Sequence, residues 1–438
     1  MTRLPTPRDV VVIGGGIAGL ACAWYAVQDG HRVTLLDRGG PEGDRCSLGN
    51  AGMIVPSHFV PLASPGSVKA GLLSLANPYS PLRVAPRLDP GYLRWCWQFL
   101  HAARSSRVAL AAPALRDLAL LSRRGYEALH LLWPQGVPLA EHGMLILCRG
   151  RHALREERES AHMAQRLGMP VEILDRDAAA ALEPGLDMTI AGAVRYPLDA
   201  HTVPQRVVSA LVAGLTEAGA DLRWHTGATR LRRDGTRIAA AVTDEGEVGG
   251  DEFVIAAGMW SAALARDIDL PLPLLAGKGY SFTLRAPRVR PHACALLAEA
   301  RIAVTPMGDT LRFAGTMELC GIDQAIDPRR VAAMIDAIPA YYPQFGPADF
   351  AGITPWAGLR PCSPDGLPYI GRTQRATNAL VATGHAMMGL SLAPATGRVV
   401  SDLIAGREPS VPIELYAPDR FARERGSARA REQIAHIL

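Results

Sequence analysis

The sequence predicts an α/β protein with two domains. One is a Rossmann-like dinucleotide-binding domain, and the other is built on a mixed, largely antiparallel sheet plus helices. Three observations predict this class. A strand, a glycine-rich turn and a helix open the chain, and a group of strands follows over residues 278–318. The chain also has 438 residues, of which 48% are hydrophobic, and this is enough for two buried cores.

The opening segment carries the strongest signal. An apolar strand over 9–13 enters the turn Gly14-Gly15-Gly16-Ile17-Ala18-Gly19, and a helix follows. Gly14 and Gly16 let the backbone approach a pyrophosphate, and Gly19 lets the helix pack closely on the sheet. A second strand ends at Asp37, placed to accept hydrogen bonds from an adenosine ribose. The segment predicts a bound dinucleotide, and its place near the N-terminus is usual for FAD without excluding NAD.

The first half of the chain then predicts mostly helices. Residues 59–90 are rich in proline and glycine, which predicts a long irregular crossing segment. Residues 90–132 follow a helical apolar pattern, 143–148 predict a short strand, and 151–167 predict a charged surface helix. A helix over 203–218 and a strand from Asp221 lead back to the first domain.

The second half predicts mostly strands. Residues 229–252 predict a small meander with turns at Asp234-Gly235 and Glu245-Gly246. Residues 253–261 predict a central strand ending in a small-residue turn, where backbone passes close to a bound cofactor. The sheet of the second domain is predicted over 278–285, 301–306 and 311–318. A helix from about Ala393 to Ala405, with Pro394 in its first turn, closes the fold.

This order of elements predicts a discontinuous first domain. Residues 1–80, 198–265 and 350–438 are expected to bind the cofactor, and residues 81–197 and 266–349 to bind the substrate.

Composition and charge give no indication of nucleic-acid binding or of a metal site. A formal net charge of +4 over the whole chain gives no argument for nucleic-acid binding. The seven cysteines show no C-x-x-C pair and no metal-ligand spacing, so no metal is predicted. Reduced thiols in a cytoplasmic compartment are the simplest interpretation, since no signal peptide and no membrane-spanning run is visible. The sequence leaves the oligomeric state open.

One stretch raises the question of a membrane surface. Residues 92–100 mix tyrosine, tryptophan, phenylalanine and leucine, and arginines flank them on both sides. This mixture suits an interfacial helix, which would give peripheral contact with the inner face of the cell membrane. The alternative, which the pattern favours, is that these side chains pack within a helical layer of the second domain.

Residues near the other end of the chain decide the cofactor. Gly358-Leu-Arg-Pro-Cys-Ser-Pro-Asp-Gly-Leu-Pro-Tyr-Ile-Gly371 is followed by Ala382-Thr-Gly-His-Ala-Met-Met-Gly-Leu-Ser-Leu-Ala-Pro-Ala-Thr-Gly397. With the N-terminal turn and Ser47-Leu-Gly-Asn-Ala-Gly52, these segments resemble the D-amino acid oxidase/dehydrogenase family, which includes glycine oxidase and sarcosine oxidase. The resemblance to bacterial D-amino acid dehydrogenases runs through nearly the whole chain.

The resemblance implies that the first domain is an FAD-binding domain. Cys362 is expected to be a small packed residue, and the flavin to be held without a covalent bond. Asp37 stands where relatives more often have glutamate, which shortens the reach but keeps the acceptor. The cofactor-binding residues implied are Gly14, Gly15, Gly16, Ile17, Ala18, Gly19, Asp37, Arg38, Ser47, Asn50, Ala51, Gly52, Ala228, Thr229, Ala257, Gly258, Gly384, His385, Met387, Met388, Gly389, Leu390 and Ser391.

Three residues are candidates for the chemistry. Arg360 stands where glycine oxidase and its relatives use an arginine for the substrate carboxylate, and a planar guanidinium matches two carboxylate oxygens. His385 is a candidate to give the reduced flavin a hydrogen bond or a positive charge, with a structural histidine as the alternative. Tyr280 is a candidate to shape or cover the substrate pocket.

The resemblance implies oxidative deamination of D-amino acids by hydride transfer from Cα to flavin N5. D-Alanine-type substrates would give a 2-oxo acid and ammonia, whereas D-proline or hydroxy-D-proline, as in hydroxyproline catabolism, would give a cyclic imine. A quinone-type acceptor is expected to take the electrons. Two alternatives stay open: an amine oxidase of the glycine or sarcosine type that uses O₂, and a non-catalytic flavin subunit of an amine dehydrogenase complex.

Overall fold

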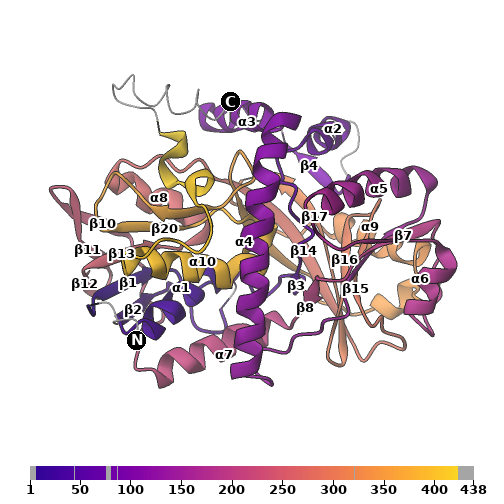
Figure 1. The fold of residues 1–438 in the computed structure, drawn as a ribbon, viewed down its shortest axis with the longest axis horizontal. Helices are drawn as coiled ribbons and strands as arrows, with labels where there is room; N and C mark the ends of the chain where they lie inside the picture. Colours follow the sequence, from indigo (N-terminus) through magenta and orange to yellow (C-terminus); the bar gives the residue numbers. More distant parts are fainter. Residues whose placement is uncertain (1–5, 44, 75–79, 86, 320, 423–438) are drawn as a thin grey trace.

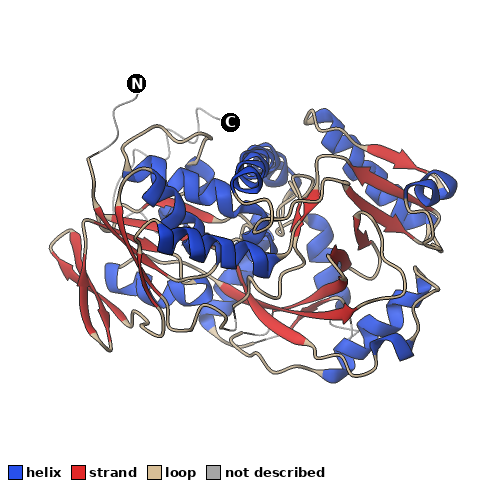
Figure 2. Ribbon diagram, turned by 90° about the horizontal axis from the view of Figure 1, so that it is seen from below, coloured by secondary structure: helices blue, strands red, loops and turns tan. Residues whose placement is uncertain are grey.

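The computed structural model describes residues 6–43, 45–74, 80–85, 87–319 and 321–422. Two sheets lie at opposite ends of the molecule, and the long helix α4 (Ser105–Leu132) runs between them (Figure 1). Figure 2, seen from below, looks nearly along α4 and shows helices packed between the two groups of strands. The predicted α/β class with a mixed second sheet is confirmed.

The first sheet has six strands and is mostly parallel. Its central strand β1 (Asp9–Ile13) pairs in parallel with its two neighbours, β2 and β13, and only β19 runs antiparallel. In spatial order the strands are β19 (Tyr369–Arg372), β20 (Ala379–Thr383), β13 (Glu252–Ile255), β1, β2 (Arg32–Leu36) and β9 (Asp221–Arg223).

Different layers cover the two faces of this sheet. On one face, Val10, Val12 and their neighbours pack against α1 (Ile17–Gln28), α7 (Pro204–Glu217) and α10 (Gly389–Ile404). On the other, Val11 and Ile13 pack against the predicted meander and the short helix α8 (Ser261–Ala265). The meander strands are β10 (Arg230–Asp234), β11 (Arg237–Thr243) and β12 (Gly246–Gly249).

The second sheet has nine strands, and its pairs are antiparallel except β15 with β5 and β17 with β4. In spatial order they are β18 (Trp356–Cys362), β14 (Leu275–Arg285), β17 (Thr310–Leu319), β16 (Ile302–Met307), β15 (Cys294–Leu297), β5 (Met144–Cys148), β7 (Gly192–Tyr196) and β6 (Glu172–Leu174), with β4 (Leu82–Val84) beside β17. The helices α5 (Arg151–Arg166), α6 (Arg176–Leu182) and α9 (Pro328–Ala337) belong to this half.

A small two-stranded sheet connects two segments that lie far apart in the sequence. The strands β3 (Met53–Ile54) and β8 (Ala200–His201) pair antiparallel, so the segment after Ser47-Gly52 meets the segment that returns to the first sheet.

Three sequence predictions of local structure need correction. The crossing segment 59–90 is not irregular throughout, because it contains α2 (Pro65–Ser74), which Pro65 opens, and β4. The domain boundary at 350 falls too early, since β18 pairs with β14 in the second sheet. The last helix begins at Gly389 rather than near Ala393, so Pro394 lies inside it.

Pro394 is tolerated inside α10 because another helix supplies the missing donor. Proline has no N–H, so the carbonyl of Leu390, one turn earlier, loses its helical partner. The hydroxyl of Tyr126 on α4 donates to that carbonyl at 2.7 Å. Gly125, the residue beside it, leaves room for Pro394, since a Cβ there would lie 2.4 Å from the proline ring.

Candidate active site

The glycine turn after β1 has no room for a side chain at Gly14, Gly15 or Gly19. Gly14 has φ +115°, and a Cβ there would lie 2.5 Å from the carbonyl oxygen of Ala256 at the end of β13. A Cβ on Gly19 would lie 1.8 Å from the carbonyl oxygen of Gly14, so α1 is packed directly on the turn. The backbone is therefore the surface that this turn presents, which fits a pyrophosphate.

Side chains from two segments surround the turn. Ser47 Oγ accepts from the N–H of Ile17 at 3.0 Å, at the amino end of α1 beside Ala18. Asp37 accepts from the N–H of Gly15 at 2.5 Å and from that of Gly39 at 2.7 Å. Asp37 Oδ1 also lies 3.4 Å from Arg45 Nη2, whereas Oδ2 keeps a further lone pair, so Asp37 fits the role of a ribose acceptor. The positive end of the α1 dipole lies at the same place, which suits phosphate.

The predicted residues beyond the second strand gather around Asp37 and Arg38. Thr226 N–H donates to the Asp37 carbonyl at 2.8 Å, and a Cβ on Gly227 would lie 2.8 Å from the Arg38 Cβ. Ala228 and Thr229 follow directly. The N–H and hydroxyl of Thr229 both donate to the carbonyl of Val242 inside the meander, so its hydroxyl proton is already used.

The turn after β13 closes the other side. The guanidinium of Arg38 lies 3.5 Å over the ring of Trp260, just past Ala257 and Gly258. Gly258 has φ +56°, and its carbonyl accepts from the hydroxyl of Thr383 at 3.0 Å. Sequence reasoning predicted this small-residue turn but missed Trp260, whose only sequence signal is an aromatic residue directly after the small ones.

A third group of predicted residues comes together at the amino end of α10. Asn50 Nδ2 donates to the carbonyl of Met387 at 3.3 Å, and Asn50 Oδ1 accepts from Gly52 N–H at 2.9 Å. Ser391 Oγ accepts from the N–H of Val55 at 3.0 Å. The structure thus joins the segment containing Ser47, Ala51 and Gly52 to the segment containing Gly384, Met387, Met388, Gly389, Leu390 and Ser391.

The imidazole of His385 is hydrogen-bonded to another side chain of the protein and is not free to bind a ligand through Nε2. The side chain is buried, and its Nε2 lies 2.9 Å from the hydroxyl oxygen of Thr396. That hydroxyl donates its own proton to the carbonyl of Leu392, so Nε2 must carry the proton of the imidazole. Burial lowers the pKa of His385 to about 4, so the ring is neutral at neutral pH. The suggestion that His385 supplies positive charge is therefore wrong, and the structural interpretation fits.

This arrangement gives a pH-dependent stability. In the unfolded chain a histidine has a pKa of 6.5, whereas in the fold that of His385 is about 4. Below pH 6.5 the unfolded chain therefore takes up a proton that the folded chain refuses, and stability falls as the pH drops toward 4. We expect His385→Asn, which can still donate to Thr396, to reduce this loss. The free energy of unfolding of the wild type and of His385→Asn, measured with denaturant between pH 4 and 6.5, checks this prediction. The other titrating groups affect both proteins alike, so they cancel in the difference between the two pH curves. Parallel curves would contradict the assignment.

Arg360 lies on the face of β18 and β14 that meets the Ser47–Gly52 segment. A Cβ on Gly279 of β14 would lie 2.1 Å from Arg360 Nη2, so the guanidinium rests on bare backbone. Its Nη1 donates to the carbonyl of Thr316 at 2.5 Å. Burial lowers its pKa, and no carboxylate of the described residues forms an ion pair with it. On the same face the ring of Trp356 fills the space over Gly49, where a Cβ would lie 2.0 Å from it.

Tyr280 lies on the opposite face of β14. Its side chain is fully buried with Phe282, Phe313 and Phe350, whereas Arg360 projects toward the other side of the strand pair. The Tyr280 hydroxyl accepts from the N–H of Asp327 at 3.4 Å. Tyr280 is therefore packed in the core of the second sheet, away from Arg360, and its role at a substrate pocket stays a prediction. A bulge in the pairing with β17, between Lys278 and Tyr280, makes alternation along this strand a poor guide to its faces.

Arg312 is a site residue that sequence reasoning missed. It is buried on β17, and its Nη1 donates to the carbonyls of Leu48 at 2.9 Å and Asn50 at 2.8 Å. Its Nε donates to the hydroxyl of Thr283 at 3.1 Å, and burial lowers its pKa to about 10. Arg312 therefore fastens the second sheet to the Ser47–Gly52 segment. The available signal was a charged residue between two apolar ones, Leu311 and Phe313.

Removing this side chain has a predictable cost. We expect Arg312→Met to lower the free energy of unfolding by ~1–3 kcal/mol, because two carbonyls and a hydroxyl lose a buried donor. Flavin affinity should fall with it, because the Ser47–Gly52 segment loses its anchor. Thermal unfolding and flavin retention on dialysis measure both effects, with the exposed Arg285→Met on the neighbouring strand as control. Equal behaviour of the two variants would show that Arg312 fastens nothing.

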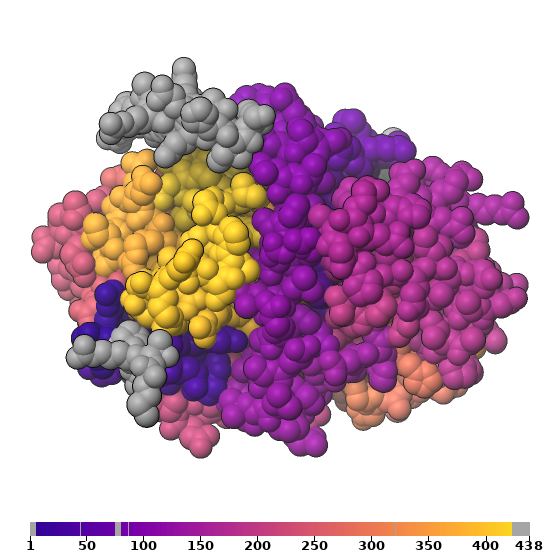
Figure 3. Space-filling model, in the orientation of Figure 1, coloured from indigo at the N-terminus to yellow at the C-terminus, as the bar shows by residue number. Residues whose placement is uncertain are grey.

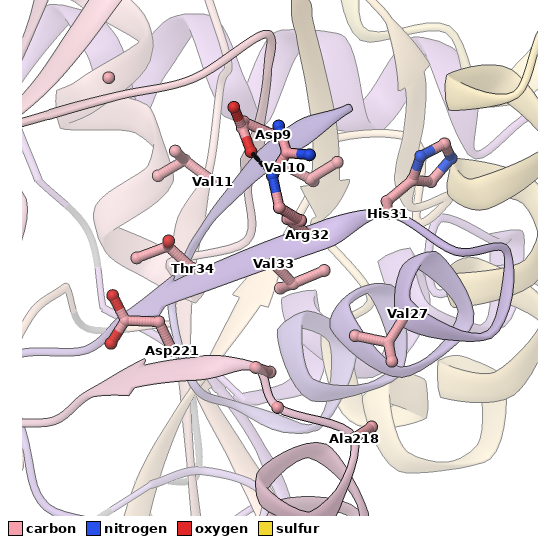
Figure 4. Close-up of a pocket in the computed structure, with 13 residues that line it drawn as sticks. Asp9, Val10, Val11, Val27, His31, Arg32, Val33, Thr34, Ala218 and Asp221 are labelled. Atoms are coloured by element: carbon pink, nitrogen blue, oxygen red, sulfur yellow. Dashed lines mark hydrogen bonds and ion pairs between the residues drawn. The ribbon is translucent and has the colours of Figure 1, made fainter. Parts of the chain in front are cut away.

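A polar surface hollow lies away from this site. It has a volume of about 380 Å³ and lies at the starts of β1 and β2, lined by Asp9, His31, Arg32 and Asp221 among others (Figure 4). Asp9 Oδ1 accepts from Arg32 Nε at 2.6 Å within it. Ligands of such sheets bind at the carboxyl ends of the strands, so this hollow is not the dinucleotide site.

The fold defines a class: an α/β protein whose mostly parallel sheet has a glycine turn after β1, and whose second, mixed sheet carries Arg360. The chain belongs to the family described as FAD dependent oxidoreductase, which matches residues 9–403. The glycine turn, Asp37 and the amino ends of α1 and α10 fit that cofactor.

Several known proteins are similar over almost their whole length. A D-amino acid dehydrogenase of Bradyrhizobium diazoefficiens is 31% identical over 424 residues, covering 95% of this chain and 100% of that protein. One of Paramagnetospirillum magneticum is 33% identical over 423 residues, covering 94% and 98%. The crystal structure of glycine oxidase from Geobacillus kaustophilus is similar in fold, with a TM-score of 0.76, 23% identity, and coverage of 95% of this chain and 100% of that one.

Proposed function

We propose that the protein catalyses FAD-dependent oxidative deamination of D-amino acids and passes the electrons to a quinone-type acceptor. D-Alanine-type substrates would give a 2-oxo acid and ammonia, and D-proline or hydroxy-D-proline a cyclic imine. The observation that carries this proposal is Arg360, a half-buried cation that forms no ion pair with a carboxylate of the described residues and lies on the face of the second sheet that meets the Ser47–Gly52 segment. The names of the similar D-amino acid dehydrogenases support the substrate class.

The residues of the chain divide the work of such a reaction. The guanidinium of Arg360 binds the substrate carboxylate and so fixes the orientation of Cα. Arg312 holds the Ser47–Gly52 segment in place, and its charge adds to the positive potential of this face. Bound FAD supplies the acceptor for a hydride from Cα. The amine must be neutral for that transfer, and water then hydrolyses the iminium product.

The amino end of α10 has a separate role. Backbone N–H groups at Gly389, Leu390 and Ser391 open this helix and carry the positive end of its dipole. They suit negative charge that develops on a cofactor during reduction, a role that neutral His385 does not fill. We propose these residues, with the glycine turn, Asp37, Ser47 and Asn50, as the cofactor-binding set.

The proposed acceptor places the protein at a membrane at least part of the time, because long-chain quinones dissolve in the bilayer. No helix in the described part of the chain is long and apolar enough to cross a membrane. Contact would therefore be made by a surface of the folded protein.

The visible spectrum of the purified holoenzyme, held without oxygen, tests this function. Bleaching of the flavin bands by D-alanine or D-proline, and not by the L-forms, is the expected result. Bleaching by glycine or sarcosine alone would overturn the D-amino acid assignment. Re-oxidation of the reduced enzyme by a soluble quinone should be much faster than by air, and the reverse order would identify an oxidase.

A further inference from the structure

The helices α2 and α3 (Pro90–Ala102) carry a group of exposed apolar side chains. On α3, Leu93, Trp97 and Leu100 recur at helical spacing and are 52%, 59% and 55% exposed. On α2, Leu72 and Leu73 are more than half exposed. We call these five residues the α2–α3 face. The two helices lie at the upper end of the molecule in Figure 1, beside the start of α4, and Figure 3 shows the start of α4 at the same end.

The opposite side of α3 is well packed, so the helix itself is firmly held. Tyr92 and Trp95 are buried, and the rings of Trp95 and Phe99 stack at 5.2 Å. The packing interpretation of residues 92–100 is therefore confirmed for the inner side chains, whereas membrane contact of the outer ones stays a prediction. The inner ones pack against the second sheet, and the outer ones are left exposed.

The segment that carries the α2–α3 face is rich in basic residues. Between residues 60 and 110 the sequence has six lysines and arginines and a single acidic residue, Asp89. Asp89 caps α3, because its carboxylate accepts from Tyr92 N–H at 2.7 Å. Lys69, Arg94, Arg104 and Arg107 are exposed. This combination of leucine, tryptophan and basic side chains is typical of surfaces that lie on anionic lipid.

We propose that the α2–α3 face docks the protein on an anionic phospholipid bilayer. The apolar side chains would enter the boundary of the acyl chains, while the basic side chains meet the headgroups. A second copy of the chain fits less well, because a symmetric contact places the same basic residues opposite one another. Positive charge on the face and negative charge on the bilayer are complementary.

This face lies directly outside the proposed active site. Trp95 Nε1 on the inner side of α3 donates to the carbonyl of Cys362 at 3.1 Å, and Cys362 follows Arg360 by two residues on β18. Ala386, beside the amino end of α10, belongs to the same packed cluster as Tyr92 and Trp95. A bilayer on the α2–α3 face therefore brings dissolved quinone near the flavin end of the site. That consequence rests on the proposed function, whereas docking itself does not.

Flotation of the holoenzyme with vesicles tests the docking. The vesicles are phosphatidylcholine alone, or phosphatidylcholine with about one third phosphatidylglycerol. Wild-type protein should float with the anionic vesicles and much less with the neutral ones. The double variant Leu93→Ser/Trp97→Ser should lose at least about tenfold in vesicle affinity. Leu131→Ser/Leu132→Ser is the matched control, because these exposed leucines lie at the other end of α4, and it should float like the wild type.

Two results would overturn the proposal. One is that the wild-type protein does not float with the anionic vesicles, or that Leu93→Ser/Trp97→Ser floats with them as well as the wild type does. The other is a wild-type dimer, seen by light scattering without vesicles, that Leu93→Ser/Trp97→Ser converts to monomer, because the face would then join two copies. Flotation needs no substrate, so it fails or succeeds independently of the D-amino acid reaction. Both variants should keep wild-type rates with a soluble quinone, which shows that they fold.

Discussion

Replacing Arg360 by alanine is expected to leave flavin bound and to weaken substrate binding by ~2–5 kcal/mol, which is roughly 30- to 5,000-fold. The reason is the absence of a carboxylate partner within the described residues: in the resting protein the guanidinium has only the Thr316 carbonyl as a close oxygen acceptor. A substrate carboxylate would supply the missing charge in a partly buried place. Removing the arginine leaves that carboxylate desolvated and unpaired.

The effect should appear mainly in KM when the amino acid is varied, with Arg360→Lys between alanine and wild type. A point charge keeps the attraction but loses the fork that binds two oxygens. Arg285→Ala, exposed at the far end of β14, is the control for the loss of an arginine from this sheet. Unchanged KM in Arg360→Ala would remove the substrate role. Loss of flavin at normal stability would instead make Arg360 a cofactor residue.

Local features of the site could be predicted from the sequence because their chemistry is local. The turn Gly14–Gly19 and Asp37 lie within one strand–turn–helix–strand unit, where the glycines themselves dictate the geometry. The central strand β13 was predicted for the same reason, since a short apolar run ends in small residues.

The faces of the second sheet could not be predicted in this way. Tyr280 and Arg312 sit on adjacent strands, but a β-bulge shifts the pairing, and only tertiary contacts show which side meets the cofactor domain. The start of α10 was missed for a related reason. Proline at position 394 predicts a helix start from sequence alone, and only Tyr126, distant in sequence, makes it tolerable inside a helix.

The glycine turn makes the second strong prediction, that Gly14→Ala yields protein without flavin. At φ +115° an L-residue is strained, and the added methyl carbon would also lie 2.5 Å from the carbonyl oxygen of Ala256. Relief requires β1 and β13 to separate or the turn to move, and either change spoils the surface that holds the pyrophosphate. Together these costs amount to roughly 2–6 kcal/mol of stability.

Gly30→Ala separates the two contributions. Gly30 also has a positive φ, +83°, but a Cβ there would meet nothing within 4 Å. Its variant should lose only about 1–2 kcal/mol from backbone strain and keep its flavin. The ratio of flavin absorbance to protein, with thermal unfolding of each variant, measures both effects. If Gly14→Ala behaved like Gly30→Ala, the close contact with β13 would not matter to the cofactor. A flavin-free but folded Gly14→Ala would show that the turn serves binding more than folding, because the remaining sheet contacts would suffice to hold β1 in place.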